Sequence, residues 1–493
     1  MNATVSTTPS GVELRKWQQE ALTAIVNKAE KGQDTFTVIA TMGSGKTFLQ
    51  GAAAHWALST KKVDLIVNIV PSDKLRETNS AEFRKHFGVR LSTNINAPLP
   101  PWAVGYVTTY HALANAKRAS KLISYLKDAR VFMMADEVHH GSDEEEAAWG
   151  GALSRLKDRS TLTLLLSGTL WRSDECCIAG VGYVPHPESP QFLVPRTDFD
   201  YTLKQATEDE VVSPVYFTEV SGKVSLSVAK NDITIADESH AVGKYSDEEV
   251  AEKSYRHLVN PKGGFVKDLL VKANDGLVHK VWQHIANKSG AVPPGGLVVA
   301  ANIKAAEEIA LILEEITGEV PYVVHSGRPG SKKSIDYFAA NDTESKWIVS
   351  VGMISEGVDI PRIKVIAYLT TARTELIFHQ IVGRAMRVRC YNGERVNEDA
   401  DVYLPATPKL HGHVTRFTEA QGNPARVSSP VELEVEDEDK EFIVRTKYEE
   451  ILTESHATGV ESFDSRGNEV SRKLKSLIID ALDQLQVFIA QAV

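Results

Sequence analysis

The sequence predicts an α/β protein built on parallel β-sheets, and three observations lead to this prediction. Short apolar runs alternate with longer helix-like stretches, as strands alternate with crossover helices in a parallel sheet. Several apolar runs end in small or polar residues, at the edge where such sheets bind ligands. The pattern occurs twice, before and after a proline-containing linker that begins near Val184.

The chain's 493 residues allow two to four domains, each with its own core. The polar segment 1–10 lacks the apolar core of a secretory signal, and no apolar run approaches the roughly 20 residues of a membrane span. Cys176, Cys177 and Cys390 fit no disulfide framework and no zinc spacing, which favours reduced thiols. We therefore expect a cytoplasmic protein without a membrane partner.

The net charge of −10 argues against a protein coated with basic surface. It does not exclude nucleic acid as a ligand, because a local groove of cations and N–H donors is sufficient for binding.

The first expected element is a helix from Leu14 to about Lys31, in which Trp17, Ala21 and other apolar residues recur at helical spacing. Gln18 has two interpretations. It belongs to a solvated polar face, or its side-chain amide reads an adenine edge with one donor and one acceptor. Spacing alone favours the solvated face.

A phosphate-binding loop is predicted next, between a strand at 36–39 and a helix at 48–58. Backbone N–H groups of such a loop and of the following helix point at phosphate oxygens. Lys46 would bridge phosphate oxygens, and the Thr47 hydroxyl would hold Mg²⁺. The alternative is a glycine-rich turn that opens an ordinary helix, but the flanking strand and helix disfavour it. The loop comprises Ala40, where the usual pattern has glycine, followed by Thr41, Met42, Gly43, Ser44, Gly45, Lys46 and Thr47.

Buried strands are expected at 65–70, 104–110 and 131–135. The third runs directly into Asp136 and Glu137, the carboxylate pair of a Walker B motif. Asp136 can hold Mg²⁺ through water, and Glu137 is placed to orient or deprotonate the attacking water. The alternative, an acidic cap before a loop, is disfavoured by Lys46 upstream.

Two histidines follow these carboxylates. His139 and His140 resemble zinc ligands, but no third ligand lies at a suitable spacing, so a coupling role is favoured. A further buried strand at 162–166 ends in Ser167-Gly168-Thr169. The hydroxyls of Ser167 and Thr169 would lie beside the carboxylates, where a nucleotide-dependent hydrogen bond can shift.

After the linker, a strand-like piece covers 215–220, and 240–290 is polar, mostly helical material without an interpretable motif. The α/β pattern then resumes, with strands expected at 296–300, 322–326, 347–351 and 365–369 and a helix at 304–317.

A helix with Gln380, Arg384 and Arg387 follows the last strand. The two arginines are three residues apart and are expected to share one helical face. Two guanidinium groups beside Gly383 suit docking against a triphosphate held by another domain, where they would neutralise charge at the γ-phosphate. The alternative is a basic helix face paired with Glu375 or solvent, and the segment alone does not decide between them.

Beyond Pro405 the α/β pattern ends. The acidic run 432–441 is interpreted as a solvated face or loop. Within it, Glu438-Asp439-Lys440 resembles half of a nuclease signature, but no strand-borne aspartate precedes it. Residues 471–492 predict an amphipathic helix, for packing or for a partner.

In this order, the motifs resemble those of superfamily 2 helicases of the DEAD/DEAH type, over roughly residues 14–405. Residues 14–21 look like the adenine-reading Q-type motif, which favours the second interpretation of Gln18. The other matches are 40–47 (motif I), 71–75 (Ia), 108–110 (Ib), 136–139 (II, as DEVH), 167–169 (III), 299–302 (IV), 355–361 (V) and 380–387 (VI).

Within the superfamily, the DEVHH form and the stretch from Ser167 to Asp174 look most like DNA-directed members. These include XPB-like helicases, phage UvsW-like proteins and motor subunits of restriction enzymes. The sequence is also similar to helicases carried by actinobacteria and their phages. DEAD-box RNA helicases carry aspartate at the position of His139, so RNA is the less favoured substrate.

The resemblance implies two RecA-like domains, 1–195 and 196–412, with ATP and Mg²⁺ in the cleft between them. It further implies a helical insertion around 240–290 and a C-terminal extension over 413–493. Catalysis is assigned to Lys46, Asp136, Glu137, Gln380, Arg384 and Arg387. ATP contacts are assigned to Arg15, Gln18, Thr41, Met42, Gly43, Ser44, Gly45, Lys46, Thr47, Gly357 and Asp359. Mg²⁺ is assigned to Thr47 and Asp136, coupling to His139, Ser167 and Thr169, and nucleic-acid contact to Pro71, Thr108, Thr109, Ser326 and Ser355.

Three functions are compatible with this resemblance. The first is an ATP-dependent DNA helicase or duplex translocase, in which ATP closes the cleft and hydrolysis opens it. The second is an RNA-dependent ATPase. The third is the motor module of a larger DNA-processing complex that contacts a protein partner through its C-terminal extension.

Overall fold

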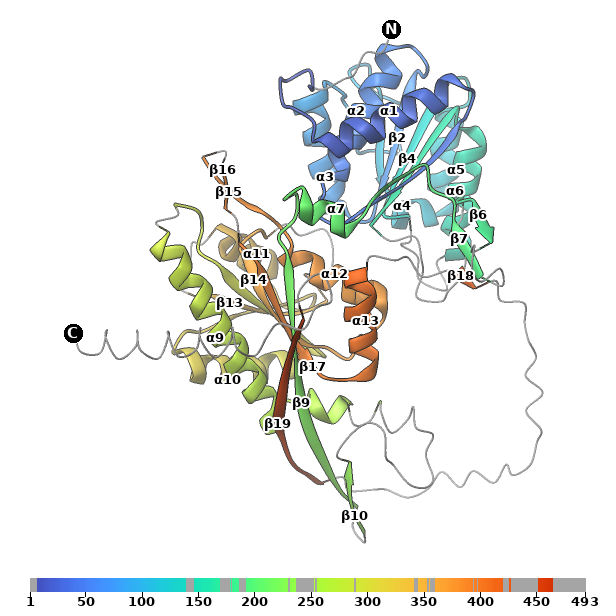
Figure 1. The fold of residues 1–493 in the computed structure, drawn as a ribbon. Coiled ribbons are helices and arrows are strands. Elements are labelled where there is room, and N and C mark those ends of the chain that lie inside the picture. Colours follow the sequence, from blue (N-terminus) through green and yellow to red (C-terminus); the bar gives the residue numbers. More distant parts are fainter. Residues whose placement is uncertain are drawn as a thin grey trace, which may run out of the picture.

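The computed structural model describes most of the chain between Thr7 and Phe463. The described residues are 7–138, 146–168, 178, 180–185, 192–228, 231–235, 252, 255–287, 290–340, 345–352, 354, 360–392, 394–396, 398–419, 425–426 and 451–463. They form two lobes (Figure 1). The expected acidic run at 432–441 and helix at 471–492 lie outside these residues.

The first lobe contains a six-stranded sheet in the order β3-β2-β4-β5-β1-β8, with every pair parallel. β4 and β5 are buried along their whole length, as strands covered on both faces must be. The parallel sheet predicted for this part of the chain is therefore confirmed. Its strands are β1 (Thr35–Ala40), β2 (Leu65–Val70), β3 (Gly105–Thr109), β4 (Val131–Asp136), β5 (Leu162–Ser167) and β8 (Phe199–Tyr201).

Helices cover both faces of this sheet because successive side chains of a strand point to opposite faces. In β4, Phe132 and Met134 enter the core that includes α1 and α2, whereas Met133 and Ala135 enter the core beneath α4, α5 and α6. The helices are α1 (Lys16–Glu30), α2 (Lys46–Ser59), α3 (Asp73–Glu82) with its π-helical continuation η1 (Phe83–Phe87), α4 (Tyr110–Ala114), α5 (Ala116–Tyr125) and α6 (Glu146–Arg159).

The second lobe contains an eight-stranded sheet in the order β10-β9-β17-β14-β11-β13-β12, with β19 paired with β9. The six strands from β9 to β12 in this order are parallel, whereas β10 and β19 run antiparallel to β9. The strands are β9 (Val215–Val228), β10 (Asn231–Ile235), β11 (Gly295–Ala300), β12 (Tyr322–His325), β13 (Trp347–Val351), β14 (Ile363–Leu369), β17 (Ala400–Pro405) and β19 (Ile451–Phe463).

β9 is longer than the piece predicted at 215–220, and it extends beyond the rest of its sheet (Figure 1). β19 pairs with it from Phe217 to Ser227. The expected C-terminal extension therefore contributes a strand to the second lobe.

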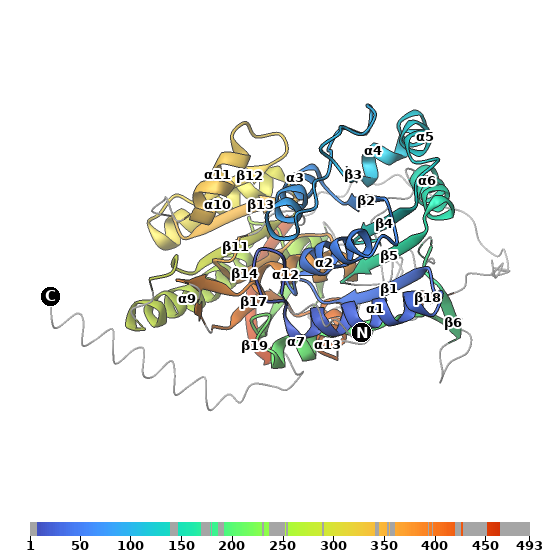
Figure 2. The same ribbon diagram turned by 90° about the horizontal axis from the view of Figure 1, so that it is seen from above.

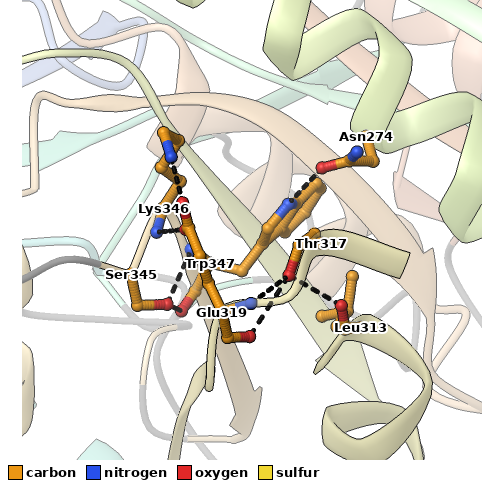
Figure 3. Close-up of polar contacts among 7 residues, drawn as sticks. All are labelled: Asn274, Leu313, Thr317, Glu319, Ser345, Lys346 and Trp347. Carbon is orange, nitrogen blue, oxygen red and sulfur yellow. Dashed lines mark hydrogen bonds and ion pairs between the residues drawn. The ribbon is translucent and has the colours of Figure 1, made fainter. Parts of the chain in front are cut away.

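Helices also cover the sheet of the second lobe. α9 lies within the expected insertion at 240–290 and buries Phe265, Leu269 and Leu277 among other residues. Figure 3 shows how its Asn274 accepts a hydrogen bond of 3.0 Å from Trp347 Nε1, next to an ion pair of Lys346 with Glu319. The helices are α9 (Gly264–Ala286), α10 (Ile303–Thr317), α11 (Ser331–Ala340), α12 (Glu375–Ala385) and α13 (Pro408–Glu419).

The connection between the lobes runs from β8 through α7 (Leu203–Glu208) to β9. Because β8 pairs with β1, the sheet of the first lobe extends past the expected boundary at 195. α3 faces the second lobe beside α11 (Figure 2), where Lys74 Nζ lies 3.9 Å from Asp336 Oδ1. The remaining strands form two small sheets, β6 (Tyr183–Pro185) with β7 (Phe192–Pro195) and β18 (Ala425–Arg426), and β15 (Arg389–Tyr391) with β16 (Glu394–Val396).

Candidate nucleotide site between the lobes

Three parallel strands of the first lobe end side by side. β1 pairs with β5 so that Ile39 lies opposite Ser167, and β5 pairs with β4 so that Leu166 lies opposite Asp136. Because the carboxyl ends of parallel strands share one edge, the segments that follow these strands meet there. The register therefore brings the predicted phosphate-binding loop, the carboxylate pair and Ser167 together.

The loop after β1 turns sharply into α2. Gly43 and Gly45 have φ angles of 79° and 95°, in the left-handed region that residues with a side chain rarely adopt. Gly45 is also the N-cap of α2 and provides no side-chain acceptor for the first turn. The first N–H groups of a helix have no intrahelical acceptor, so this end of α2 suits an anion such as phosphate.

Lys46 and Glu137 form an ion pair across the strand ends. Lys46 Nζ lies 2.7 Å from Glu137 Oε1 and donates to the Ala40 carbonyl at 3.2 Å. The other carboxylate oxygen of Glu137 accepts from Ser167 Oγ at 3.2 Å and from the Gly168 N–H at 3.1 Å. Glu137 thus connects the segments that follow β1, β4 and β5.

Glu137 itself has a φ of 50°, a left-handed conformation that costs a non-glycine residue on the order of 1 kcal/mol. The turn after β4 is fixed on its other side by Tyr110, whose hydroxyl donates to the Asp136 carbonyl at 2.6 Å. In this backbone conformation the Glu137 carboxylate contacts both Lys46 and Ser167.

Asp136 fits a role in holding a divalent cation. Its side chain is buried, and none of the described residues donates a hydrogen bond to Oδ1. Burial and the neighbouring Glu137 carboxylate raise the pKa of Asp136 to about 7, although the Lys46 ammonium opposes this shift. Two adjacent carboxylates beside one ammonium leave excess negative charge, which Mg²⁺ with oxygen ligands would balance.

The predicted second ligand, Thr47, lies in the first turn of α2, with Oγ1 3.5 Å from Asn79 Oδ1. Within the described ranges, no group of three or more His, Cys, Asp or Glu side chains could hold a metal ion. Mg²⁺ commonly keeps several waters and uses one or two protein oxygens plus substrate phosphates, so Asp136 and Thr47 together fit this mode of binding.

α1 supports the loop from behind. Arg15 Nη1 donates to the Ser44 carbonyl at 2.5 Å, and Trp17 Nε1 donates to the same oxygen at 3.2 Å. Gln18 Nε2 donates to the Gly45 carbonyl at 2.9 Å, while its Oε1 accepts from the Arg15 N–H. Gln18 is buried, so the interpretation that placed it on a solvated face is wrong. Its contact with adenine stays a prediction.

The second lobe contacts the loop directly through the segment with the predicted arginines. A Cβ added to Gly383 of α12 would lie 2.8 Å from Met42 Sδ, and one added to Gly43 would lie 3.6 Å from Arg387 Cδ. The structure therefore brings Gly383 and Arg387 to the phosphate-binding loop. Gln380 is buried within α12.

One expectation for this segment is wrong. α12 ends at Ala385 with Met386 as its C-cap, so Arg387 lies beyond the helix and does not share a helical face with Arg384. The physical reason is that the carbonyls of residues 385–387 bind donors from Lys364 and Ser213 instead of continuing the helix.

Four of the predicted nucleic-acid residues are described, and they lie at or directly after the ends of strands. Thr108 and Thr109 are buried, and the Thr109 hydroxyl accepts from the Ala112 N–H at 3.2 Å as the N-cap of α4. Pro71 is half-buried after β2, and Ser326 is exposed after β12. Contact of these residues with nucleic acid stays a prediction.

Several predicted residues lie outside the described part of the chain, so the structure does not place them. They are His139, His140, Thr169, Ser355, Gly357 and Asp359, together with Cys176 and Cys177. Cys390 is exposed and forms no disulfide among the described residues. Of the helices in the described ranges, none has the length and apolar character needed to cross a membrane.

The structure also reveals contacts that sequence reasoning missed. Tyr201 of β8 stacks on Trp17 with ring centroids 4.9 Å apart, and its hydroxyl donates to Asp209 Oδ2 at 2.8 Å. The contact between Met42 and Gly383 joins the lobes. The small Gly383 beside Arg384 was a usable signal for the second contact, whereas no motif in the sequence marks Tyr201.

Two family models match the chain. Residues 11–172 match the model described as type III restriction enzyme, res subunit, and residues 283–389 match the helicase conserved C-terminal domain. The first match contains the phosphate-binding loop and the carboxylate pair, and the second contains α12 with Arg384, and Arg387 after it. One model therefore falls within each lobe.

The chain is similar to curated mycobacterial proteins. It is 30% identical over 401 residues to an uncharacterized protein of Mycobacterium tuberculosis (strain ATCC 25618 / H37Rv), with 80% of this chain and 62% of the relative covered. Identity over 402 residues to a protein of Mycobacterium leprae (strain TN) is also 30%, with the same coverage. The chain thus spans less than two thirds of the length of these relatives.

Among solved structures, the fragment of a putative HsdR subunit of a type I restriction enzyme from Vibrio vulnificus YJ016 gives a TM-score of 0.52 at 14% identity, covering 83% of this chain and 67% of that one. The DNA-bound type ISP restriction-modification enzyme LlaBIII gives 0.50 at 16% identity, covering 80% of this chain and 28% of that one. The DNA-bound helicase MrfA gives a TM-score of 0.50 at 13% identity, covering 86% of this chain and 54% of that one. At these identities the likeness concerns the fold: two tandem RecA-like domains.

Proposed function

We propose that this chain is an ATP-driven motor of the superfamily 2 helicase type that translocates on DNA or separates its strands. The restriction-enzyme res-subunit model and the helicase C-terminal model that match its two lobes support this proposal. One observation carries the proposal. The Lys46–Glu137 pair of the first lobe lies beside a loop that the second lobe contacts through Gly383 and Arg387. ATP bound at this loop would be enclosed by both lobes, so its hydrolysis can change how the lobes are joined.

The residues of the first lobe would bind and activate the nucleotide. The N–H groups at the start of α2 and the Lys46 ammonium would bind the β- and γ-phosphates. Asp136 and Thr47 would hold Mg²⁺, which shields phosphate charge when bound. Glu137 would orient the attacking water and accept its proton, because its carboxylate lies beside Lys46, which would bind the terminal phosphate.

The second lobe would complete the site only when the lobes are joined. Arg384 and Arg387 would neutralise charge that develops at the γ-phosphate, with Gln380 beside them. Ser167 would couple hydrolysis to nucleic-acid binding. Its hydroxyl donates to the Glu137 carboxylate, which would orient the attacking water. His139 and Thr169 would assist this coupling.

DNA is favoured over RNA by the DEVH form of motif II and by the match to a restriction-enzyme subunit. Two of the solved structures with this fold are DNA-bound enzymes, which is consistent with this choice. Contacts from Pro71, Thr108, Thr109, Ser326 and Ser355 would be mostly to phosphate and would give little sequence preference.

Phosphate release by the purified chain tests the proposal. We expect hydrolysis to be stimulated by duplex or single-stranded DNA more than by RNA. Lys46→Ala and Glu137→Gln should each lower the rate at least about 100-fold, whereas Lys16→Ala, at an exposed position of α1, should leave it unchanged. Hydrolysis at the wild-type rate in both site variants would refute the assignment. Stronger stimulation by RNA would support the second candidate, an RNA-dependent ATPase.

The third candidate is a motor subunit of a larger restriction or repair complex. It is favoured by the family model that matches residues 11–172, which is described as a restriction-enzyme subunit. Sedimentation of the fluorescence-labelled chain in an extract of the same cells tests this candidate. It is supported if the chain sediments with a partner only when residues after Phe463 are present. Full DNA-stimulated hydrolysis and strand separation by the chain alone would favour the first candidate.

A further inference from the structure

The second lobe contains a buried lysine that the proposed reaction does not use. Lys364, on β14, is 0% exposed. Its Nζ donates to Ser213 Oγ at 2.8 Å, to the Ala385 carbonyl at 3.3 Å and to the Arg387 carbonyl at 2.5 Å. A buried ammonium is strongly unfavourable unless its protons are bonded, and three acceptors match its three protons. This side chain is therefore held in one position.

The acceptors of Lys364 belong to the end of α12. The last carbonyls of a helix have no intrahelical donor, and a cation is favourable beside them. Lys364 binds the carbonyls of Ala385 and Arg387, and the Ser213 N–H donates to the Met386 carbonyl between them at 2.8 Å. Three consecutive carbonyls are thus held, and the chain turns out of the helix at this point.

The third partner, Ser213, belongs to the segment that joins the lobes. The adjacent Val212 lies 3.5 Å from the position of a Cβ on Gly43, close to Arg387 Cδ. In the same connecting segment, the Glu210 carbonyl accepts a hydrogen bond of 2.6 Å from Arg395 Nη1. The connecting segment therefore contacts both the phosphate-binding loop and the turn that carries Arg387.

We propose that Lys364 is a positioning residue for Arg387. By fixing the backbone of residues 385–387 and tying it to Ser213, it sets the direction in which the Arg387 side chain extends toward the phosphate-binding loop. The inference rests on the proposed function, in which Arg387 acts on the γ-phosphate. Lys364 is fully buried and donates to Ser213 and to this turn, so it would act through the turn.

Lys364→Met tests this role, because methionine fills a similar volume without the three donors. A displacement on the order of 1 Å at a reacting group costs roughly 100-fold in rate. We therefore expect the DNA-stimulated kcat for ATP hydrolysis to fall roughly 10- to 100-fold, with KM for ATP changed less than about threefold. In an Arg387→Ala background, Lys364→Met should cause no further loss beyond about twofold, because the interaction it supports is already gone.

Arg362→Met is the matched control. Arg362 is also a buried cation next to β14, but it donates to the carbonyls of Pro293 at 3.1 Å and Phe338 at 2.8 Å, away from α12. It should lower the melting temperature without a loss in kcat at a temperature where the variant is folded. If Lys364→Met does not fold, Ser213→Ala removes one of the three partners and should give a smaller kcat loss that also disappears in the Arg387→Ala background.

The inference would be overturned if the kcat losses of Lys364→Met and Arg387→Ala multiplied in the double variant. It would also be overturned if Lys364→Met and Arg362→Met lost kcat equally. In both cases wild-type hydrolysis would still support the proposed function. Absence of hydrolysis in the wild-type chain with any nucleic acid would overturn the proposed function, and this inference with it.

Discussion

Replacing Gly383 with alanine adds one methyl group between the two lobes. The new Cβ would lie 2.8 Å from Met42 Sδ and 3.2 Å from Met42 Cβ. Non-bonded heavy atoms prefer about 3.5–4.0 Å, so the sulfur must move by roughly 1 Å and the Met42 Cβ by a few tenths of an ångström. The thioether can move, because it ends a flexible side chain. The Met42 Cβ cannot move without the loop.

The expected magnitude follows from this overlap. Adding a methyl group to a close contact costs about 1–3 kcal/mol, which lowers the population of the joined lobes by roughly 5- to 150-fold. The effect on folding has the opposite sign. Gly383 lies inside α12, where alanine is favoured over glycine by about 0.5–1 kcal/mol, so the second lobe should become slightly more stable.

Steady-state phosphate release and thermal unfolding measure these two effects separately. We expect kcat/KM for ATP to fall within the stated range while the melting temperature is unchanged or higher. Gly412→Ala in α13 is the control, since its new Cβ would meet only the Arg416 guanidinium, at ordinary distances of 3.5 Å from Nη1 and 3.9 Å from Nη2. Adding Met42→Ala to Gly383→Ala should restore part of the activity, because it removes the sulfur but keeps the Cβ.

A Gly383→Ala protein that is folded and hydrolyses ATP at the wild-type rate would refute the reasoning. It would mean that the contact between Met42 and Gly383 is not part of the arrangement in which ATP is hydrolysed.

Three further predictions follow from single sites. Glu137→Gln should abolish hydrolysis but leave the affinity for a fluorescent ATP analogue within a few-fold; a parallel loss of binding would contradict the assigned role. Gly51→Ala should lower the free energy of unfolding by about 1–3 kcal/mol in urea, because its Cβ would lie 2.3 Å from Phe87 Cδ2, and an unchanged midpoint would disprove this. Burial lowers the pKa of Lys364 from 10.5 to about 7, so between these values the unfolded chain binds more protons than the native one. The free energy of unfolding of the wild type should therefore fall as pH is lowered from about 10 to 7, by at most about 1.4 kcal/mol per pH unit. Below pH 7, Lys364 should make no further contribution to the pH dependence. Lys364→Met should lack this dependence in urea unfolding at pH 6 to 9, and identical pH profiles for the two proteins would count against the shift.

The parts of the fold that local patterns determine were predictable. The strand at 131–135 and the carboxylates after it are adjacent in sequence, so the position of Asp136 followed directly from the apolar run. The phosphate-binding loop was predictable for the same reason. Two parallel sheets followed from the alternation of strands and helices, because right-handed crossovers leave few other arrangements.

The parts that depend on distant partners were not predictable. α12 ends before Arg387 because of Lys364 and of Ser213, which lies 151 positions from Lys364 in the chain. Gln18 is buried because the loop that it supports folds over it. β9 is paired from Phe217 to Ser227 with β19, which comes from the far end of the chain, and β10 pairs with it from Val224 to Val228. No periodicity in the local sequence contains this information.

The pairing of β19 with β9 affects how the C-terminal part can be studied. A protein truncated after α13 would lose the strand that covers β9 from Phe217 to Ser227, so its peptide groups there would be open to pairing with another chain. Such a truncated protein should self-associate, and its loss of cellular function would then reflect aggregation and not a missing partner. A truncation after Phe463 keeps the pairing and separates the two causes.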